Sequence, residues 1–312
     1  MNILFWMDHP STFNEKKDST YLLIHECIVR GFQVYYIHDV EINNSELMTT
    51  VQKIHSFDLN QKITVDSQMM RLPQSSIHAI WIRKDPPVDE AYVRHLLIFQ
   101  QFNQTVSFFN DPLGVLKTNE KLVVTQFPHL TPKTLVTQNK DGLLEFISQQ
   151  DTCVLKPLNG FGGQGIFKIS KNNTNLLPLL ELLTHHFTQQ IICQTAVRHE
   201  GGDKRIILVN QHPIGAINRV NPNGHRNNFM AGGHAEKVDV TSKDLKIIEA
   251  IAPMLKENGL FFVGIDILDG YLIEINVTSP TGLQEVNHLN SDNTQDIIID
   301  AMEKVIKEKI NA

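Results

Sequence analysis

The run Phe-Phe-Val-Gly-Ile-Asp-Ile-Leu-Asp-Gly-Tyr-Leu-Ile-Glu-Ile-Asn-Val-Thr-Ser-Pro, residues 261–280, carries the clearest pattern in the chain. It predicts two apolar strands that are joined by a tight turn at Asp269-Gly270. Asp266, Glu274 and Asn276 interrupt the apolar residues. A carboxylate buried in a strand is costly unless it is paired or binds a cation, so the hairpin predicts a polar site.

The length of the turn determines which face of the hairpin Asp266 occupies. A two-residue loop would pair Ile265 with Glu274 and point Asp266 away from the polar groups of the second strand. A three-residue loop, Leu268–Gly270 with its glycine in the left-handed conformation, pairs Gly264 with Glu274 and places Asp266 on their face. We favour the three-residue loop because it gathers two carboxylates and an amide oxygen, a donor set that suits Mg²⁺. The alternative is a hairpin with exposed acids, which the apolar surroundings of Asp266 disfavour.

Composition sets the class of protein. The chain has 312 residues and a formal net charge of -6, enough for two or three domains and without a long basic run. These features argue against nucleic acid and anionic membranes as partners, and no apolar run approaches the ~20 residues that span a bilayer. Cys27, Cys153 and Cys193 lie isolated in apolar runs. We therefore expect reduced, buried thiols and a cytoplasmic location.

The first third of the chain alternates between strand and helix patterns. Strands are predicted at residues 3–7, 33–37, 80–82 and 106–110, and helices at 19–30, with Ser19 as its cap, and 89–101. This alternation predicts a parallel sheet covered on both faces. Residues 38–78 are poorly patterned and we expect them to be partly irregular, with an added strand pair. Ligands of parallel sheets bind beyond the carboxyl ends of the strands, where residues 8–18 and 83–85 are polar.

A glycine-rich segment marks the middle of the chain. Residues 153–157 form an apolar strand that holds Lys156, residues 159–165 contain four glycines, and a second strand follows at 166–169. The glycines match a dinucleotide-binding pattern by letter, but they lie between two strands instead of opening a helix. We therefore expect a hairpin whose backbone N–H groups fold over phosphates. Asn119-Glu120-Lys121 is expected to open a helix.

The last third contains a long polar loop. Strands are predicted at 206–209 and 214–220, and helices at 241–258 and 294–309. Between them, residues 221–236 are too long and too polar for an ordinary turn, and loops of this kind are often functional lids.

Taken together in order and spacing, the motifs resemble those of the ATP-grasp carboxylate–amine ligases, most closely the bacterial glutathione synthetases. The resemblance covers nearly the whole chain and rests on Lys16-Lys17-Asp18-Ser19, Arg83-Lys84-Asp85-Pro86-Pro87, Asn119-Glu120-Lys121-Leu122, Leu130-Thr131-Pro132, Leu155-Lys156-Pro157-Leu158, Gly201-Gly202-Asp203-Lys204-Arg205, Ala231-Gly232-Gly233, Phe262-Val263-Gly264-Ile265-Asp266 and Glu274-Ile275-Asn276-Val277-Thr278-Ser279-Pro280-Thr281. It implies an α/β fold with a three-domain ATP-grasp architecture: an N-terminal parallel-sheet domain at 1–117, a central subdomain at 118–198 and a C-terminal subdomain at 199–312.

The resemblance also implies where ATP and the metal bind. ATP would contact Lys121, Lys156, Gly160, Gly162, Gly163, the adenine hinge Gln194, Thr195 and Val197, the ribose ligand Asp203, and Arg205. Arg205, Arg219 and Lys156 would be catalytic and face the transferred phosphoryl group. The metal, Mg²⁺ with Mn²⁺ as an alternative, would be held by Asp266, Glu274 and Asn276, in agreement with the hairpin pattern.

The implied reaction joins γ-glutamylcysteine to glycine through an acyl phosphate, at the expense of ATP. The substrates would contact Asp18, Ser19, Arg83, Arg226, Asn276, Ser279 and Thr281. The sequence departs from the family at Thr195-Ala196 and at Gly282-Leu283-Gln284, which leaves adenine packing and local substrate contacts open. An alternative is another ATP-grasp ligase that joins D-alanines or adds glutamates, and a non-catalytic nucleotide-binding regulator is a further one. The family precedent is a homo-oligomer, a dimer or tetramer.

Overall fold

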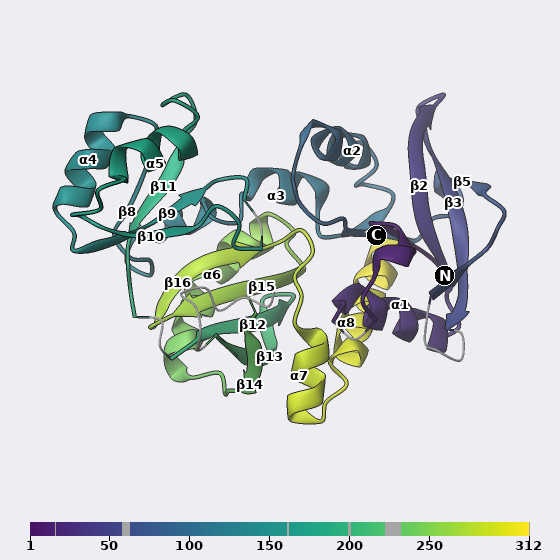
Figure 1. Ribbon diagram of the computed structural model, residues 1–312. Coiled ribbons are helices and arrows are strands. Elements are labelled where there is room, and N and C mark those ends of the chain that lie inside the picture. Colours follow the sequence, from purple (N-terminus) through teal and green to yellow (C-terminus); the bar gives the residue numbers. More distant parts are fainter. Residues whose placement is uncertain (16, 58–62, 161, 199–200, 222–231, 312) are drawn as a thin grey trace.

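The computed structural model describes residues 1–15, 17–57, 63–160, 162–198, 201–221 and 232–311. These residues form three β-sheets with helices packed on them (Figure 1). The N-terminal sheet is mixed and the two that follow are antiparallel. Within the described part of the chain, no helix has both the length and the apolar character needed to cross a membrane.

The N-terminal sheet confirms the predicted parallel core. Its strand order is β4-β3-β2-β1-β6-β7, and β2, β1, β6 and β7 run parallel, with β5 paired to β3. The bounds are β1 Asn2–Met7, β2 Gln33–Asn43, β3 Glu46–Phe57, β4 Ile63–Val65, β5 Met70–Pro73, β6 Ala79–Arg83 and β7 Ser107–Phe109, with helices α1 Ser19–Val29, α2 Glu90–Gln100 and α3 Pro112–Lys117. Of the poorly patterned residues 38–78, those up to Phe57 belong to the long antiparallel β2–β3 hairpin, which extends from the body in Figure 1, and β4 and β5 follow as added strands paired with β3.

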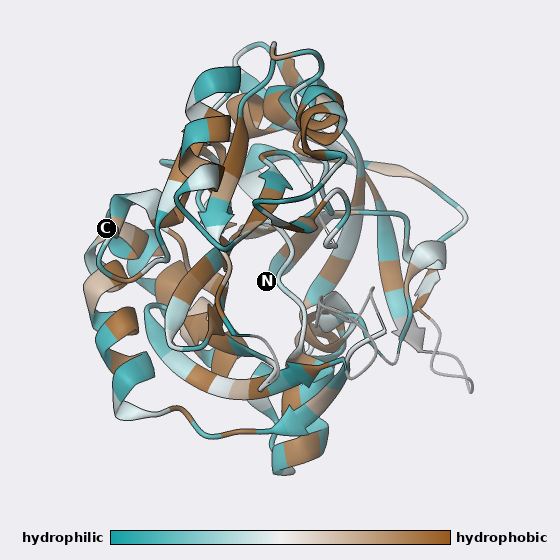
Figure 2. Cartoon of the chain, turned by 60° about the vertical axis from the view of Figure 1, so that its left-hand side comes forward, coloured by the Kyte–Doolittle hydropathy of each residue, from teal (hydrophilic) through white to brown (hydrophobic). Residues whose placement is uncertain are grey.

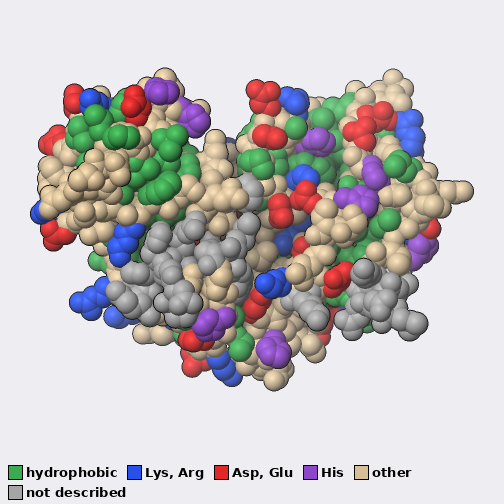
Figure 3. All heavy atoms as spheres, in the orientation of Figure 1, with side chains coloured by type: hydrophobic (Ala, Val, Ile, Leu, Met, Phe, Trp, Pro, Cys, Tyr) green, Lys and Arg blue, Asp and Glu red, His purple; other side chains and the backbone are tan. Residues whose placement is uncertain are grey.

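The central sheet forms a lobe with its own core. Its order is β10-β9-β11-β8, with β8 Thr134–Thr137, β9 Thr152–Pro157, β10 Phe167–Ser170 and β11 Ile191–Thr195. Helices α4 Lys140–Ser148 and α5 Leu176–Leu183 cover one face over a core that includes Leu155 and both lobe cysteines. The space-filling view shows hydrophobic side chains gathered on the outside of this lobe (Figure 3). The glycine segment connects two antiparallel strands, as predicted.

The C-terminal sheet has the order β14-β13-β12-β15-β16. Its strands are β12 Asp203–Val209, β13 His212–Val220, β14 His234–Lys237, β15 Phe262–Leu268 and β16 Tyr271–Asn276, and α6 Ser242–Glu257 covers one face. Two predictions need correction. Residues 234–237 of the expected loop are a strand paired with β13, and residues 119–121 open only a short 3₁₀ helix, Val123–Gln126. Residues 222–231, which include Arg226, lie outside the described part of the chain.

The β15–β16 hairpin has a shorter turn than predicted, but its polar side chains share one face as predicted. Leu268 pairs with Tyr271, so the loop has two residues, and both have positive φ, 50° at Asp269 and 80° at Gly270. The expected three-residue loop is therefore wrong. A register shift after Asp266 leaves Ile273 as an extra residue and places Asp266 opposite Glu274. A β-bulge restores the shared face that a regular two-residue hairpin would have lost.

The two ends of the chain pack together. Helices α7 Leu283–Asn290 and α8 Thr294–Ile310 follow the C-terminal sheet and lie against α1 of the N-terminal domain. One hydrophobic cluster contains Phe5 and Trp81 from the N-terminal sheet, Phe262 from β15 and Met302 from α8. The strands in Figure 2 alternate between hydrophobic and hydrophilic segments, as expected for sheets with one face on a core. The N-terminal and C-terminal sheets thus share cores, whereas the central lobe has its own.

Candidate active site

A cleft of about 490 Å³ lies between the central lobe and the C-terminal sheet. It is lined by the two lysines predicted to bind phosphate, by the two arginines predicted to be catalytic, and by the three predicted metal ligands. Of the predicted site residues, the lining contains Lys121, Lys156, Gly162, Gly163, Gln194, Thr195, Val197, Asp203, Arg205, Arg219, Asp266, Glu274, Asn276, Ser279 and Thr281. The volume is within the range of small-ligand sites.

The register of three neighbouring strands creates the charged floor of the cleft. Arg205 on β12 is opposite Asp266 on β15, which is opposite Glu274 on β16, and directly opposed residues share a face. Arg219 on β13 is opposite Asp203, two residues before Arg205. The sequence therefore places alternating positive and negative side chains across the sheet.

These side chains form a continuous ion-pair cluster. Arg205 donates to both oxygens of Asp266 at 2.6 and 2.7 Å, and Arg219 reaches Asp266 at 2.9 Å and Asp203 at 2.6 Å. Burial alone would raise the pKa of Asp266, but Arg205 and Arg219 outweigh it and hold that pKa well below its usual range. Burial raises the pKa of Asp203 despite the neighbouring Arg219. Asp266 is therefore anionic at neutral pH and holds two cations toward the cleft.

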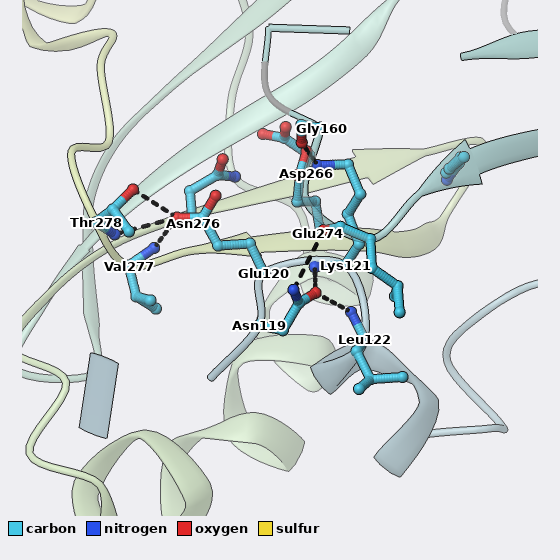
Figure 4. A network of polar contacts seen from close by, with 12 residues as sticks. Asn119, Glu120, Lys121, Leu122, Gly160, Asp266, Glu274, Asn276, Val277 and Thr278 are labelled. Carbon is cyan, nitrogen blue, oxygen red and sulfur yellow. Dashed lines mark hydrogen bonds and ion pairs between the residues drawn. The ribbon is translucent and has the colours of Figure 1, made fainter. Parts of the chain in front are cut away.

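Lys121 and Glu120 connect the segment before the central lobe to strand β16 (Figure 4). Lys121 donates to Glu274 at 2.8 Å and also bonds the carbonyl oxygen of Gly160 in the glycine loop. Burial alone would lower the pKa of Lys121, and the Glu274 carboxylate outweighs that effect and raises it. Glu120 accepts from Val277 N at 2.8 Å, Thr278 N at 3.1 Å and Thr278 Oγ1 at 2.9 Å. Adjacent residues thus hold the metal candidate and the loop that follows it.

Lys156 reaches the cleft from the central lobe. Its ammonium is buried and donates to Gln194 Oε1 at 2.8 Å, and Gln194 is held in turn by the hydroxyls of Thr131 and Thr134. Burial lowers the pKa of Lys156 to about 8. A buried ammonium with one neutral partner is prepared to bind an anion.

The donor set fits a hard divalent cation. Two carboxylates and an amide lie on one sheet face, and Asn276 donates its NH₂ to Gly264 O at 3.1 Å, which leaves its Oδ1 as an acceptor. Oxygen donors of this kind suit Mg²⁺ or Mn²⁺. In the described residues no group of three or more His, Cys, Asp or Glu side chains could hold a metal, so Asn276 would be needed as the third ligand.

Three residues predicted to bind substrate are not part of the cleft lining, and each of them makes hydrogen bonds within the protein. Asp18, and not Ser19, caps α1 by accepting from Thr20 N at 2.7 Å. The fully buried Ser19 accepts from Leu283 N at 3.2 Å. Arg83 is buried and donates to Thr20 Oγ1 and Pro280 O, each at 3.0 Å. These residues fix the loop 278–281 relative to α1, and substrate contact by them stays a prediction.

The departure at Gly282-Leu283-Gln284 has a structural explanation. Gln284 donates to Glu15 O at 2.7 Å and to Asp18 O at 3.1 Å, so it fixes the loop before α1. Gly282 has a φ of 119° and lies against the side chain of Arg205, which favours glycine. Three cleft carboxylates were not anticipated as site residues: Asp85, Glu120 and Glu285. The sequence offered Asp85 and Glu120 within quoted motifs, but only the fold brings Glu285 to the cleft.

Two solved structures that share this fold are a synthetase and a ligase. A D-cycloserine synthetase superposes with a TM-score of 0.67 at 16% identity, covering 97% of this chain and 99% of that one. A D-alanine–D-alanine ligase from Bacillus anthracis in complex with ATP gives 0.59 at 13% identity, covering 99% of each chain. The chain therefore shares the ATP-grasp fold of these ligases, and the predicted fold class is confirmed.

Sequence comparisons identify the family. Residues 1–115 match the prokaryotic glutathione synthetase N-terminal domain, and residues 120–291 match the ATP-grasp domain of the same enzymes. Glutathione synthetase from Agrobacterium fabrum is 35% identical over 97% of this chain and 96% of its own length, and that from Synechococcus elongatus is 35% identical over 99% and 100%. The chain belongs to the prokaryotic glutathione synthetase family and is an ATP-dependent carbon–nitrogen ligase.

Proposed function

We propose that this ligase joins the cysteinyl carboxylate of γ-glutamylcysteine to the amine of glycine, converting ATP to ADP and phosphate. The observation that supports this most strongly is the cleft itself, in which Lys121, Lys156, Arg205 and Arg219 converge with the acidic face of the β15–β16 hairpin. Family membership supports the choice of substrates.

The charge distribution suits phosphoryl transfer to a carboxylate. A carboxylate does not react with an amine until its oxygen becomes part of a good leaving group, which an acyl phosphate provides. Transfer of the γ-phosphoryl group requires charge neutralisation and alignment more than covalent assistance. We assign Lys121 and Lys156 to the nucleotide phosphates, and Arg205 and Arg219 to the phosphoryl group in transfer.

Asp266, Glu274 and Asn276 are proposed to hold Mg²⁺. When bound, the cation would neutralise phosphate charge and orient the phosphoryl group. Since Lys121 and the arginines are ion-paired to these carboxylates, the same cations are correctly placed for phosphate oxygens. The phosphates are proposed to be covered by Gly160, Gly162 and Gly163. Adenine is proposed to contact Gln194, Thr195 and Val197, and the ribose is proposed to contact Asp203.

The amino-acid substrates are assigned to the part of the cleft lined by the loop 278–281. Ser279 and Thr281 line it, and the Ser279 hydroxyl bonds Asp85. We propose that γ-glutamylcysteine is bound by Asp18, Ser19 and Arg83, and that Arg226 binds a substrate carboxylate. We also propose a dimer or tetramer in solution, measurable by light scattering, and a cytoplasmic location in which the three buried cysteines stay reduced.

The function is tested with purified protein, ATP, Mg²⁺ and a panel of carboxylate and amine substrates, with ADP release as the readout. Release should require γ-glutamylcysteine and glycine together for full rate, with glutathione as the product. Full activity with two D-alanines, or with glutamate as the added amino acid, and none with γ-glutamylcysteine would overturn the proposal.

A further inference from the structure

Six carboxylates line the cleft, and five of them are hydrogen-bonded or ion-paired to another residue in the described part of the chain. Asp203 and Asp266 pair with arginines, and Glu274 pairs with Lys121. Asp85 accepts from the Ser279 hydroxyl, and Glu120 accepts three hydrogen bonds from residues 277–278. Glu285 differs, because its Oε2 is buried and has no hydrogen-bond partner among the described residues. A buried carboxylate oxygen without a donor is expensive, which points to a ligand that supplies one.

Glu285 is held close to the reacting groups by a rigid element. It lies in the first turn of α7, whose residues Leu283 and Val286 are fully buried. Arg205 Nη1 lies 3.4 Å from Thr281 O, just before this helix, so Glu285 and the catalytic arginine border the same part of the cleft. Gln284 anchors the helix start to the loop before α1. The side chain is therefore preorganised instead of being carried on a free loop.

The cleft needs a group of this kind. It offers several cations for phosphates and carboxylates, but an amine substrate arrives as an ammonium ion that cannot attack until it loses a proton. We propose that Glu285 binds the ammonium group of the amine substrate and accepts its proton, which makes Glu285 the general base of the ligation half-reaction. This inference rests on the proposed function, because it concerns the amine that attacks the acyl phosphate.

The step balances as follows. One ammonium proton moves to the Glu285 carboxylate, and the amine nitrogen uses its free electron pair to attack the acyl carbon. The carbon–nitrogen bond forms as the bond between the acyl carbon and the phosphate oxygen breaks, and phosphate leaves with that electron pair. The second proton of the nitrogen goes to the departing phosphate. Glu285 then returns its proton to water.

The surroundings of Glu285 suit a base that works near neutral pH. Burial raises the pKa of its carboxyl, and a hydrogen bond with its own backbone, together with the charges of Lys17, Arg205 and Arg219, partly offsets this effect. A carboxylate with a raised pKa accepts a proton more readily than an exposed one while it stays available in the ionised form. The neighbouring Asp266 is held anionic by two arginines and could not serve in the same way.

Hydroxylamine separates this role from a structural one. It is uncharged at neutral pH and attacks acyl phosphates without help from a base, giving a hydroxamate. In Glu285→Gln, glutathione formation from glycine should fall by about 100-fold or more, while hydroxamate formation from γ-glutamylcysteine and ATP should stay within about 3-fold of the unmodified protein. Glu249→Gln, the same change at an exposed residue of α6, should alter neither rate.

Two further results decide the outcome. In Glu285→Ala, added formate should restore part of the glycine rate if a missing base is the defect. Equal loss of both products in Glu285→Gln, or loss of neither, would overturn the role of Glu285, and so would failure of formate to rescue the alanine variant. If the unmodified protein formed no hydroxamate from γ-glutamylcysteine, the proposed function itself would fail, independently of Glu285.

Discussion

Single residues in the cleft combine structural pairing with proposed catalysis, and Glu274 is the clearest case. It accepts from Lys121 at 2.8 Å and faces Asp266 across the hairpin. Replacement by glutamine keeps the shape of the side chain and removes the charge that both a metal and a lysine would use.

Glu274→Gln should therefore weaken the apparent affinity for Mg²⁺ and reduce turnover by about 100-fold or more. The measurement is the initial rate as a function of Mg²⁺ concentration at saturating ATP. Asp269→Asn, in the exposed turn of the same hairpin, is the matched control and should behave like the unmodified protein. An unchanged Mg²⁺ dependence in Glu274→Gln would remove this residue from the metal site.

Lys156 is expected to make nucleotide binding depend on pH. Its pKa is lowered to about 8 by burial, so at about pH 8 half of the population is neutral before binding. A polyphosphate favours the ammonium form and raises this pKa, so binding should take up about half a proton per nucleotide at pH 8 and very little at about pH 6.

Calorimetry of Mg²⁺–ADP binding in buffers of different ionisation enthalpy measures this uptake. The same experiment on Lys156→Met should show weaker binding and a loss of the uptake at pH 8. Equal proton uptake in both proteins would show that a group other than Lys156 titrates.

At the scale of the element, the β15–β16 hairpin shows what the sequence could and could not predict. The polar residues at 266, 274 and 276 were enough to predict two strands and a shared face. The β-bulge at Ile273 was not predictable, because no residue type there requires it and the pairing is settled by contacts from outside the hairpin. Backbone bonds from Ile275 N to Glu120 O at 3.0 Å and from Leu272 N to Leu130 O at 2.8 Å hold β16 on both sides of the bulge.

Strand β13 and helix α7 meet without space to spare. A Cβ at Gly215 would lie 2.4 Å from Val286 Cγ1, so alanine at this position must displace the buried Val286 side chain or the helix that carries it. Gly215→Ala should lower the free energy of unfolding by about 1–3 kcal/mol.

The double variant Gly215→Ala/Val286→Ala tests that mechanism, because the shorter side chain makes room for the new methyl group. Urea denaturation should show that the double variant is more stable than the sum of the two single changes predicts. Strict additivity would mean that the two residues do not compete for the same space.

For the whole molecule, the docking of α8 against α1 was the least predictable feature. Its sequence predicts an amphipathic helix, but the pattern does not say which domain the apolar face meets. The pairing depends on residues 273 positions apart in the sequence, such as Arg30 and Glu303, whose charged groups are 3.2 Å apart. The order of the three sheets, by contrast, followed from local strand and helix patterns and from the family motifs.

Asn110 is a second long-range connection. Its side chain accepts from Phe262 N at 2.7 Å and donates to Phe262 O at 2.9 Å and to Val277 O at 2.7 Å. It therefore ties the end of the N-terminal sheet to the start of β15 and to the residue that follows β16.

Asn110→Ala should lower the free energy of unfolding by about 2–4 kcal/mol, because it removes three buried hydrogen bonds to the backbone. Urea denaturation gives this difference directly. Asn172→Ala, at an exposed turn of the central lobe, should change stability by less than about 0.5 kcal/mol. A similar small change in Asn110→Ala would show that the bridge contributes little to joining the domains.

The proposal that the cleft phosphorylates a carboxylate before an amine attacks has one direct test. γ-Glutamylcysteine labelled with ¹⁸O in its cysteinyl carboxylate is converted with ATP, Mg²⁺ and glycine, and the phosphate released is analysed by mass spectrometry. An acyl phosphate requires one labelled oxygen to appear in each phosphate formed. Glutathione formed with unlabelled phosphate, or with the label in AMP, would contradict the mechanism and the roles assigned to Arg205 and Arg219.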